Sequence, residues 1–145
     1  MSYLCDSNVW VALAVGQHVH HGATSAWFGT LGDSEVALFC RSTRISFLRL
    51  LTQNLAPGFQ PLTNRQAWAV LDRLAEDEAI GFAAEPAEID GLWRSLTERD
   101  AASPKVWMDA YLAAFAISGR MRLVTCDRDF RSFQPAGLEL LLLPS

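Results

Sequence analysis

Near its amino terminus the chain reads Tyr3-Leu4-Cys5-Asp6-Ser7-Asn8-Val9-Trp10, a short apolar run that ends in a carboxylate and leads into a second apolar segment. Apart from three histidines, Asp6 is the only acidic or basic side chain among residues 1–32. Carboxylates are almost never buried without a partner, so one at the end of an apolar run needs an explanation. We interpret 3–6 as a buried strand and 7–15 as the helix that follows it, with Ser7 as a candidate cap.

The same arrangement recurs near the other end of the chain. Asp127 follows the apolar run Leu123-Val124-Thr125-Cys126, and Asp109 is the only charge between Val106 and Ile117. Sites in open parallel sheets form beyond the carboxyl ends of the strands. We therefore expect Asp6, Asp109 and Asp127 to meet in one pocket and to share a partner, for which a divalent metal ion is the obvious candidate.

Short apolar segments and helical segments alternate along the rest of the sequence. The patterns predict helices over 21–31, 42–54, 63–77, 86–99 and 105–118, and strands over 35–40, 80–84, 123–126 and 138–143. Strands without polar alternation, separated by helices, are typical of an α/β fold with a mostly parallel sheet covered on both faces. The length fits one domain over residues 1–145.

Composition narrows the class of protein. Half of the residues are hydrophobic, yet no apolar run approaches the roughly 18 residues that cross a membrane. The amino terminus lacks the basic region of a signal peptide. Cysteines are three in number, and two of them, Cys5 and Cys126, lie in expected strands. We therefore expect reduced thiols, no membrane contact and a cytoplasmic location.

The net charge of −4 is unevenly distributed. Residues 72–100 hold nine acids and three arginines, which gives −6, so the remaining 116 residues carry +2. If a metal ion neutralises the aspartates, the surface around them is basic, and overall acidity does not exclude an anionic substrate. An ordinary solvated surface remains the alternative explanation of this pattern.

Three aspartates at one edge of a sheet indicate a particular chemistry. Carboxylate oxygens suit Mg²⁺ or Mn²⁺, and water fills the remaining positions of the ion. Such ions polarise a phosphoryl oxygen and lower the pKa of a bound water, which is the chemistry that cleaves phosphodiesters. Each acid also has a structural alternative, because Asp109 could serve a helix dipole, Asp6 a helix cap and Asp127 a turn.

The segments that carry these acids resemble the motifs of PIN-domain ribonucleases. Asp6-Ser7-Asn8-Val9 is similar to the opening motif, and Asp109 to Ala114 and Leu123 to Phe130 are similar to the two later ones. The order and the length also match, and the resemblance is closest to the VapC-type toxins of bacterial toxin–antitoxin pairs. It implies a PIN-like three-layer fold, in which helices flank a mostly parallel sheet of about five strands. It also implies the activity of an Mg²⁺-dependent (or Mn²⁺-dependent) endoribonuclease in a type II system, a cognate small antitoxin and a homodimer.

The resemblance also assigns roles to residues. Asp6, Asp109 and Asp127 would form the catalytic, metal-binding cluster, with Asn8 and Thr125 orienting it and Asp129 assisting. One position departs from the pattern, because Arg44 stands on the third helix where the family usually carries a glutamate. Arg44 could bind a substrate phosphate, or it could pair with the aspartates and displace the metal ion.

Other polar residues are less specific. Lys105 and Arg128, with Arg131, could contact substrate phosphates, or they could be ordinary solvated side chains. The histidines at 18, 20 and 21 lack the i, i+4 spacing of a helical zinc pair. We expect these histidines to have surface or capping roles, and substrate contact is the lesser alternative.

Two other functions remain open on the sequence. The first is a catalytically weakened PIN-like module that holds RNA or an antitoxin, which the arginine at position 44 motivates. The second is aspartyl phosphotransfer, since haloacid dehalogenase-like enzymes also carry an aspartate after their first strand. Those enzymes have a second aspartate two residues later, where this chain has Asn8, and this difference argues against them.

Overall fold

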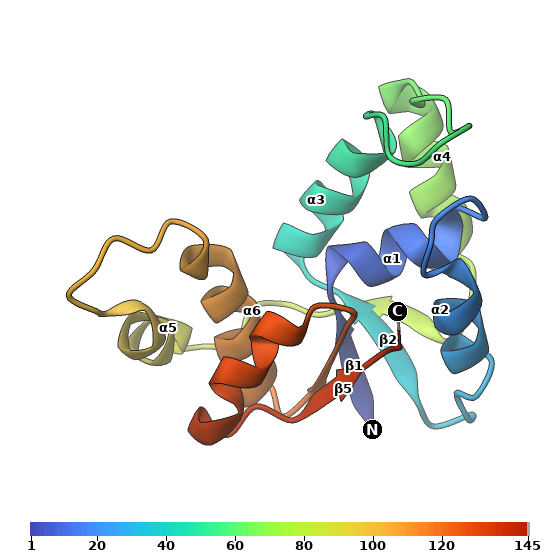
Figure 1. Cartoon of the computed structure of the whole chain (residues 1–145). Helices are drawn as coiled ribbons and strands as arrows, with labels where there is room; N and C mark the ends of the chain where they lie inside the picture. Colours follow the sequence, from blue (N-terminus) through green and yellow to red (C-terminus); the bar gives the residue numbers. More distant parts are fainter. Residues whose placement is uncertain (145) are drawn as a thin grey trace.

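Five parallel strands form the centre of the molecule in the computed structural model, which describes residues 1–144 (Figure 1). The strands are β1 (Ser2–Cys5), β2 (Val36–Phe39), β3 (Ile80–Phe82), β4 (Arg122–Thr125) and β5 (Leu140–Leu142). They lie in the order β3-β2-β1-β4-β5, and each neighbouring pair is parallel. The expected five-stranded α/β sheet is therefore confirmed.

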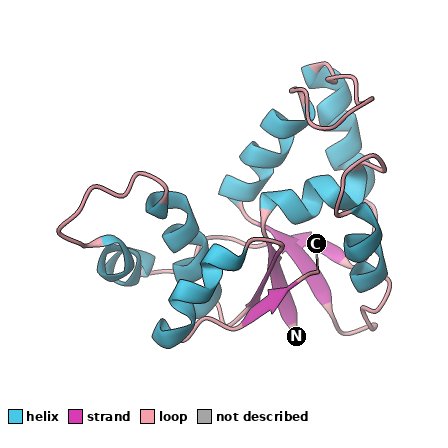
Figure 2. Cartoon of the chain, in the orientation of Figure 1, coloured by secondary structure: helices cyan, strands magenta, loops and turns pink. Residues whose placement is uncertain are grey.

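Helices cover both faces of this sheet, as Figure 2 shows. They are α1 (Ser7–Ala14), α2 (His21–Phe28), α3 (Arg41–Leu51), α4 (Asn64–Ala75), α5 (Ile89–Thr97), α6 (Val106–Ser118) and the 3₁₀ helix η1 (Arg128–Ala136). The sequence patterns missed η1. Its buried side chains, Phe130 and Phe133, are three residues apart, which fits the 3₁₀ repeat better than the 3.6-residue repeat used to find helices.

The observed helix ends differ from the expected ones by up to three residues, and two of these ends have a left-handed residue beside them. α5 begins at Ile89 and not at Pro86, and the residue before it, Glu88, has a left-handed backbone with φ 64°. α6 ends before Gly119 as expected, but the left-handed residue there is Arg120, with φ 56°. A Cβ atom at Gly119 would lie 2.7 Å from the Cε atom of Met121, the flexible end of a side chain that can shift, and 3.1 Å from the Phe115 carbonyl oxygen.

Alternate residues of the strands feed two separate cores. On β1, Tyr3 and Cys5 pack with the side chains of α1 and α3, while Leu4 packs with those of α6. The first core contains a fully buried Trp10 ring that stacks on Phe39, with ring centroids 3.8 Å apart. This period of two is the side-chain alternation of a strand buried on both faces. The strands are thus held rigidly from both sides, which keeps their carboxyl ends in place.

The segment from Phe47 to Leu51 could have been either core or interface on sequence grounds. Phe47 and Leu51 are fully buried against the first face of the sheet, and Leu48 and Leu50 pack against the same cluster. The segment therefore belongs largely to the core of the chain, and it gives no support to the homodimer that the resemblance implies.

Two expectations from composition can be compared with the structure. Cys5, Cys40 and Cys126 are all free thiols, as expected. Among the helices formed by residues 1–144, none has the length and apolar character that a membrane crossing requires.

Candidate active site

The strand order places a crevice at the carboxyl edge of the sheet. β1 lies between β2 and β4, and the chain continues from β1 into α1 but from β4 into η1. Ligands bind open α/β sheets at such a point, where the strand order reverses. Asp6 directly follows β1 and Asp127 lies two residues after β4, so both acids stand at this crevice.

The three predicted aspartates line one pocket of about 260 Å³, which we call the acidic pocket. Asp109 reaches it from the first turn of α6. The other residues that line it are Ser7 and Asn8 of α1, Ser42, Thr43, Ser46, Arg49 and Leu50 of α3, and Met108 and Leu112 of α6. The structure therefore brings Asp6 together with two acids that lie more than 100 positions later in the sequence.

Hydrogen bonds fix two of the acids. The Thr125 hydroxyl donates to Oδ2 of Asp6 at 2.9 Å and accepts from the main-chain N–H of Asp127 at 3.0 Å. Oδ1 of Asp127 accepts from the main-chain N–H of Asp129 at 2.9 Å, which caps η1. Asp6 stands at the N-cap of α1, but its side chain makes no capping hydrogen bond there. The structure thus does not support the capping alternative for Asp6, while Asp127, for which the alternative was a turn, caps η1.

The electrostatics of the acidic pocket are unfavourable for carboxylates. Burial raises the pKa of Asp6, which is only 8 % exposed, and hydrogen bonds from Thr125 and Ser7 offset part of this effect. Burial, followed by the charges of Asp6, Asp127 and Asp129, raises the pKa of Asp109 to about 6. No lysine or arginine among the described residues lowers either pKa. The cluster therefore has no cation that lowers the pKa of Asp6 or Asp109, although Arg49 lines the same pocket.

The raised pKa of Asp109 predicts a pH dependence of stability. The pKa of Asp109 is about 6 in the folded chain, against the ordinary value of 3.8 for an aspartate. Folding therefore tightens the binding of this proton. The stabilisation from this proton is complete below the unfolded pKa and is lost as the pH rises through the folded one. We expect the metal-free chain to lose stability relative to Asp109→Asn between about pH 4.5 and about pH 7. Urea unfolding of both proteins at the two pH values measures this, and a constant difference would contradict it.

The Thr125 hydroxyl allows a second prediction with a close control. Thr125→Val leaves Asp6 without a buried donor and should cost roughly 1–3 kcal/mol of unfolding free energy at neutral pH. Thr24 is equally buried, but its hydroxyl has no hydrogen-bond partner among the described residues. Thr24→Val should therefore be neutral or stabilising. Equal losses in the two variants, measured by urea denaturation, would show that the Thr125–Asp6 hydrogen bond contributes nothing.

Arg44 does not line the acidic pocket. Its guanidinium lies over the Phe82 ring, 4.1 Å from the ring centroid, and its buried Nε has no hydrogen-bond partner among residues 1–144. The basic residue that α3 presents to the pocket is Arg49. The pocket-lining positions Ser42, Ser46 and Arg49 follow one helical face, and the 3.6-residue period would have separated them from position 44. The structure thus does not place Arg44 beside the aspartates.

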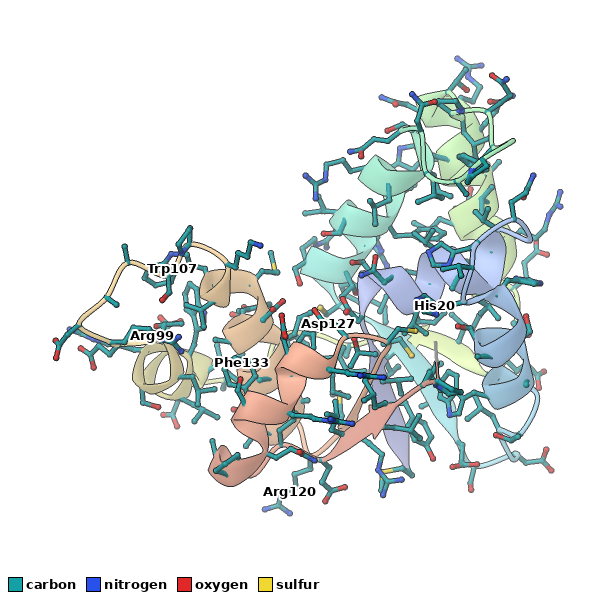
Figure 3. All side chains as sticks on the ribbon, in the orientation of Figure 1. His20, Arg99, Trp107, Arg120, Asp127 and Phe133 are labelled. Atoms are coloured by element: carbon teal, nitrogen blue, oxygen red, sulfur yellow. The ribbon has the colours of Figure 1, made fainter. Side chains whose placement is uncertain are left out.

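A second pocket, of about 400 Å³, adjoins the acidic pocket because both are lined by Asp109. We call it the cationic pocket, since Lys105 and Arg99 line it together with Asp129. Figure 3 shows Arg99 on the connection between α5 and α6. Arg128 lines neither pocket, and it is exposed at the start of η1. Sequence reasoning missed Arg99, because it lies in the most acidic part of the chain.

The donors of the acidic pocket fit a divalent cation in kind and in charge. Three carboxylates in one pocket, two of them with a raised pKa, are the kind of ligand set that Mg²⁺ and Mn²⁺ prefer. Within residues 1–144, however, no three His, Cys, Asp or Glu side chains are already spaced to hold one ion. The residue types therefore match a metal site, while their present conformations are not those of a closed one.

A fully parallel sheet with carboxylates at its switch point defines an α/β protein with an acidic active-site crevice. The model of the PIN domain matches residues 3–134, and the chain belongs to this family. It is 49% identical over 144 residues to Ribonuclease VapC41 of Mycobacterium tuberculosis. The matched region covers 97% of each of the two chains.

Solved structures show the same fold. VapBC2 from Rickettsia felis, bound to a DNA fragment from its promoter, matches with a TM-score of 0.70 over 99% of both chains at 14% identity. VapC20 of Mycobacterium tuberculosis, described as a sarcin-ricin loop cleaving toxin, matches with a TM-score of 0.65 over 94% of this chain and 95% of that one, at 17% identity. At these identities the likeness is one of fold.

Proposed function

We propose that the chain is an Mg²⁺- or Mn²⁺-dependent endoribonuclease and the toxin of a type II toxin–antitoxin pair. The observation that carries this proposal is the meeting of Asp6, Asp109 and Asp127 in one pocket, where no lysine or arginine lowers the pKa of Asp6 or Asp109. Membership of the PIN family and the ribonuclease name of a relative at 49% identity support the same activity. The VapBC complexes among the structural neighbours support an antitoxin partner.

In this proposal the three aspartates would hold the ion, which polarises a phosphoryl oxygen and makes a bound water more acidic. Thr125 donates a hydrogen bond to one oxygen of Asp6, and the N–H of Asp129 donates to one oxygen of Asp127. These two carboxylates therefore keep a fixed orientation. Lys105 and Arg99 bind a neighbouring phosphate through charge. Asn8 lines the pocket as well and offers its amide to the substrate or to Asp127.

The activity is tested by incubating the purified chain with total bacterial RNA and Mg²⁺ or Mn²⁺. New RNA ends, mapped by sequencing, should appear with either ion and disappear with excess EDTA. Cleavage that persists in EDTA would overturn the metal dependence, and absence of cleavage with both ions would overturn the nuclease assignment. Double-stranded DNA of similar length is the control substrate.

The partner is expected to act through the same acids. An antitoxin that inserts an Arg or Lys among Asp6, Asp109 and Asp127 would take over the electrostatic role of the ion. Co-expression with the product of the neighbouring gene should relieve growth arrest and give a stable complex. If that complex binds Mg²⁺ as tightly as the free chain does, this mode of inhibition is wrong.

One observation favours a second candidate, a catalytically weakened module that binds RNA or an antitoxin. α3 lines the acidic pocket with Ser42, Thr43 and Ser46 and supplies no carboxylate, so the pocket holds one acid fewer than the family pattern. Calorimetric titration separates the two candidates. A weakened module would bind RNA or antitoxin but give no heat with Mg²⁺ or Mn²⁺.

A further inference from the structure

A third hollow, of about 420 Å³, lies on another side of the acidic pocket. We call it the histidine hollow; it is lined by Asn8, His18, Val19, His20, Cys126 and Asp127. Asn8 and Asp127 also line the acidic pocket, so the two adjoin. In Figure 3, Asp127 lies near the centre of the view and His20 lies across from it, on the connection between α1 and α2.

The three hollows form a row. The cationic pocket meets the acidic pocket at Asp109, and the histidine hollow meets it at Asn8 and Asp127. A polymer whose reacting phosphate lies in the acidic pocket therefore has two adjoining hollows in which its neighbouring parts could lie. One side offers two cations and the other offers imidazoles, so the two sides suit different parts of a nucleic acid.

The histidines present defined hydrogen-bonding groups. Nδ1 of His18 accepts a hydrogen bond from the main-chain N–H of His20 at 3.1 Å. A ring nitrogen that accepts carries no proton, so His18 is neutral and its Nε2–H is a donor. Nδ1 of His20 is buried and has no hydrogen-bond partner among the described residues. This nitrogen is closed off from solvent, so His20 would reach a ligand in the hollow through its Nε2.

The lining of the histidine hollow favours a base over a phosphate. It holds no lysine or arginine and it includes the acid Asp127, so a phosphate would meet repulsion there. Val19, between the two histidines, is 83 % exposed and offers an apolar contact to a flat ring. The volume also lies in the range of about 300–1,000 Å³ that is usual for small-molecule sites.

We propose that the histidine hollow is a nucleotide subsite, which holds the base and ribose of an unpaired nucleotide next to the cleaved phosphodiester. This inference rests on the proposed ribonuclease function. His18 and His20 would read the hydrogen-bonding edge of the base, and that edge is free only in single-stranded loops and ends. The subsite thus makes His18 and His20 specificity-determining residues, while Lys105 and Arg99 contribute affinity without base selection.

Matched variants of His18 test the reading of the base. His18→Asn keeps an acceptor near the position of Nδ1 but lacks the Nε2–H donor, and His18→Gln restores a donor near the position of Nε2. Each protein cuts a pool of random single-stranded RNA with Mg²⁺, and sequencing of the new ends gives the base preference at every position. Gln17→Ala is the control, since Gln17 is an exposed residue of the same loop.

We expect a base preference beside the cleaved bond that falls about two- to tenfold in His18→Asn, the usual effect of losing one hydrogen bond. His18→Gln should recover part of the preference, and Gln17→Ala should leave it unchanged. Lys105→Gln should slow cleavage of all sequences alike. A preference identical in wild type and His18→Asn, or no preference in wild type, overturns the subsite.

A second measurement needs no catalysis. The imidazole NMR signals of His18 and His20 are followed in metal-free buffer during titration with each of the four ribonucleosides, which carry no phosphate. At least one nucleoside should shift both signals and spare His21, whose Nδ1 is hydrogen-bonded to the Ala12 carbonyl outside the hollow. No shift, or equal shifts at His21, overturns the proposal. If the wild-type chain cuts no RNA, the proposed ribonuclease function is wrong. The NMR titration then tests base binding in the histidine hollow independently of cleavage.

Discussion

Asp109→Asn is expected to abolish RNA cleavage while leaving the metal-free chain as stable as wild type, or more stable. Asp109 carries a pKa of about 6 because it is partly buried near three other aspartates. Removing its charge relieves that repulsion in the free chain and removes one negative ligand from the metal site. Losses of roughly 100- to 1,000-fold follow when one electrostatic group of an active site is deleted, and a lost ligand should reach at least this range.

Cleavage rate and melting temperature, measured on the same preparation in EDTA and in Mg²⁺, separate function from structure. Asp72→Asn on the exposed face of α4 is the control, and it should change neither quantity. The opposite result is also clear. A loss of about 3–5 kcal/mol in metal-free buffer, as on breaking a buried ion pair, would show that Asp109 holds the fold together.

The parts of the site that could be predicted from the sequence are those with a local signal. An apolar run followed by an acid marks both Asp6 and Asp127, because a buried strand and its carboxyl end are adjacent in the chain. Asp109 stands out as the only charge of an apolar helix, although its position in the pocket depends on how α6 packs. Thr125 adjoins the acid motif and bonds to both acids.

The parts that were missed depend on packing between distant segments. Arg49 and Arg44 lie on one helix, and only the docking of α3 on the sheet decides that the first lines the pocket and the second covers Phe82. Arg99 is brought beside Asp109 by the connection between α5 and α6. The histidine hollow likewise needs Cys126, just after β4, to lie near the α1–α2 loop, an arrangement that no local pattern encodes.

The placement of α3 also predicts where an acid would restore the family pattern. Ser46→Glu puts a carboxylate on the helical face that lines the acidic pocket, and it should raise the Mg²⁺ affinity of the free chain at least about tenfold. The reason is Coulombic, since a unit charge roughly 6 Å from a divalent ion contributes about 1.4 kcal/mol even at a water-like dielectric constant. The additional repulsion should lower the melting temperature without metal, so metal binding should stabilise this variant more than wild type.

Arg44→Glu is the matched control, because it adds the same side chain to the same helix on a face away from the pocket. Its Mg²⁺ affinity should change less than that of Ser46→Glu, since position 44 does not line the acidic pocket and salt screens charges at longer range. Calorimetric titration of the three proteins at one ionic strength makes the comparison. If Arg44→Glu gains Mg²⁺ affinity and Ser46→Glu does not, the metal ion lies against the face of α3 that carries residue 44. The resemblance to the family at position 44 would then describe the site better than the packing of the helix does.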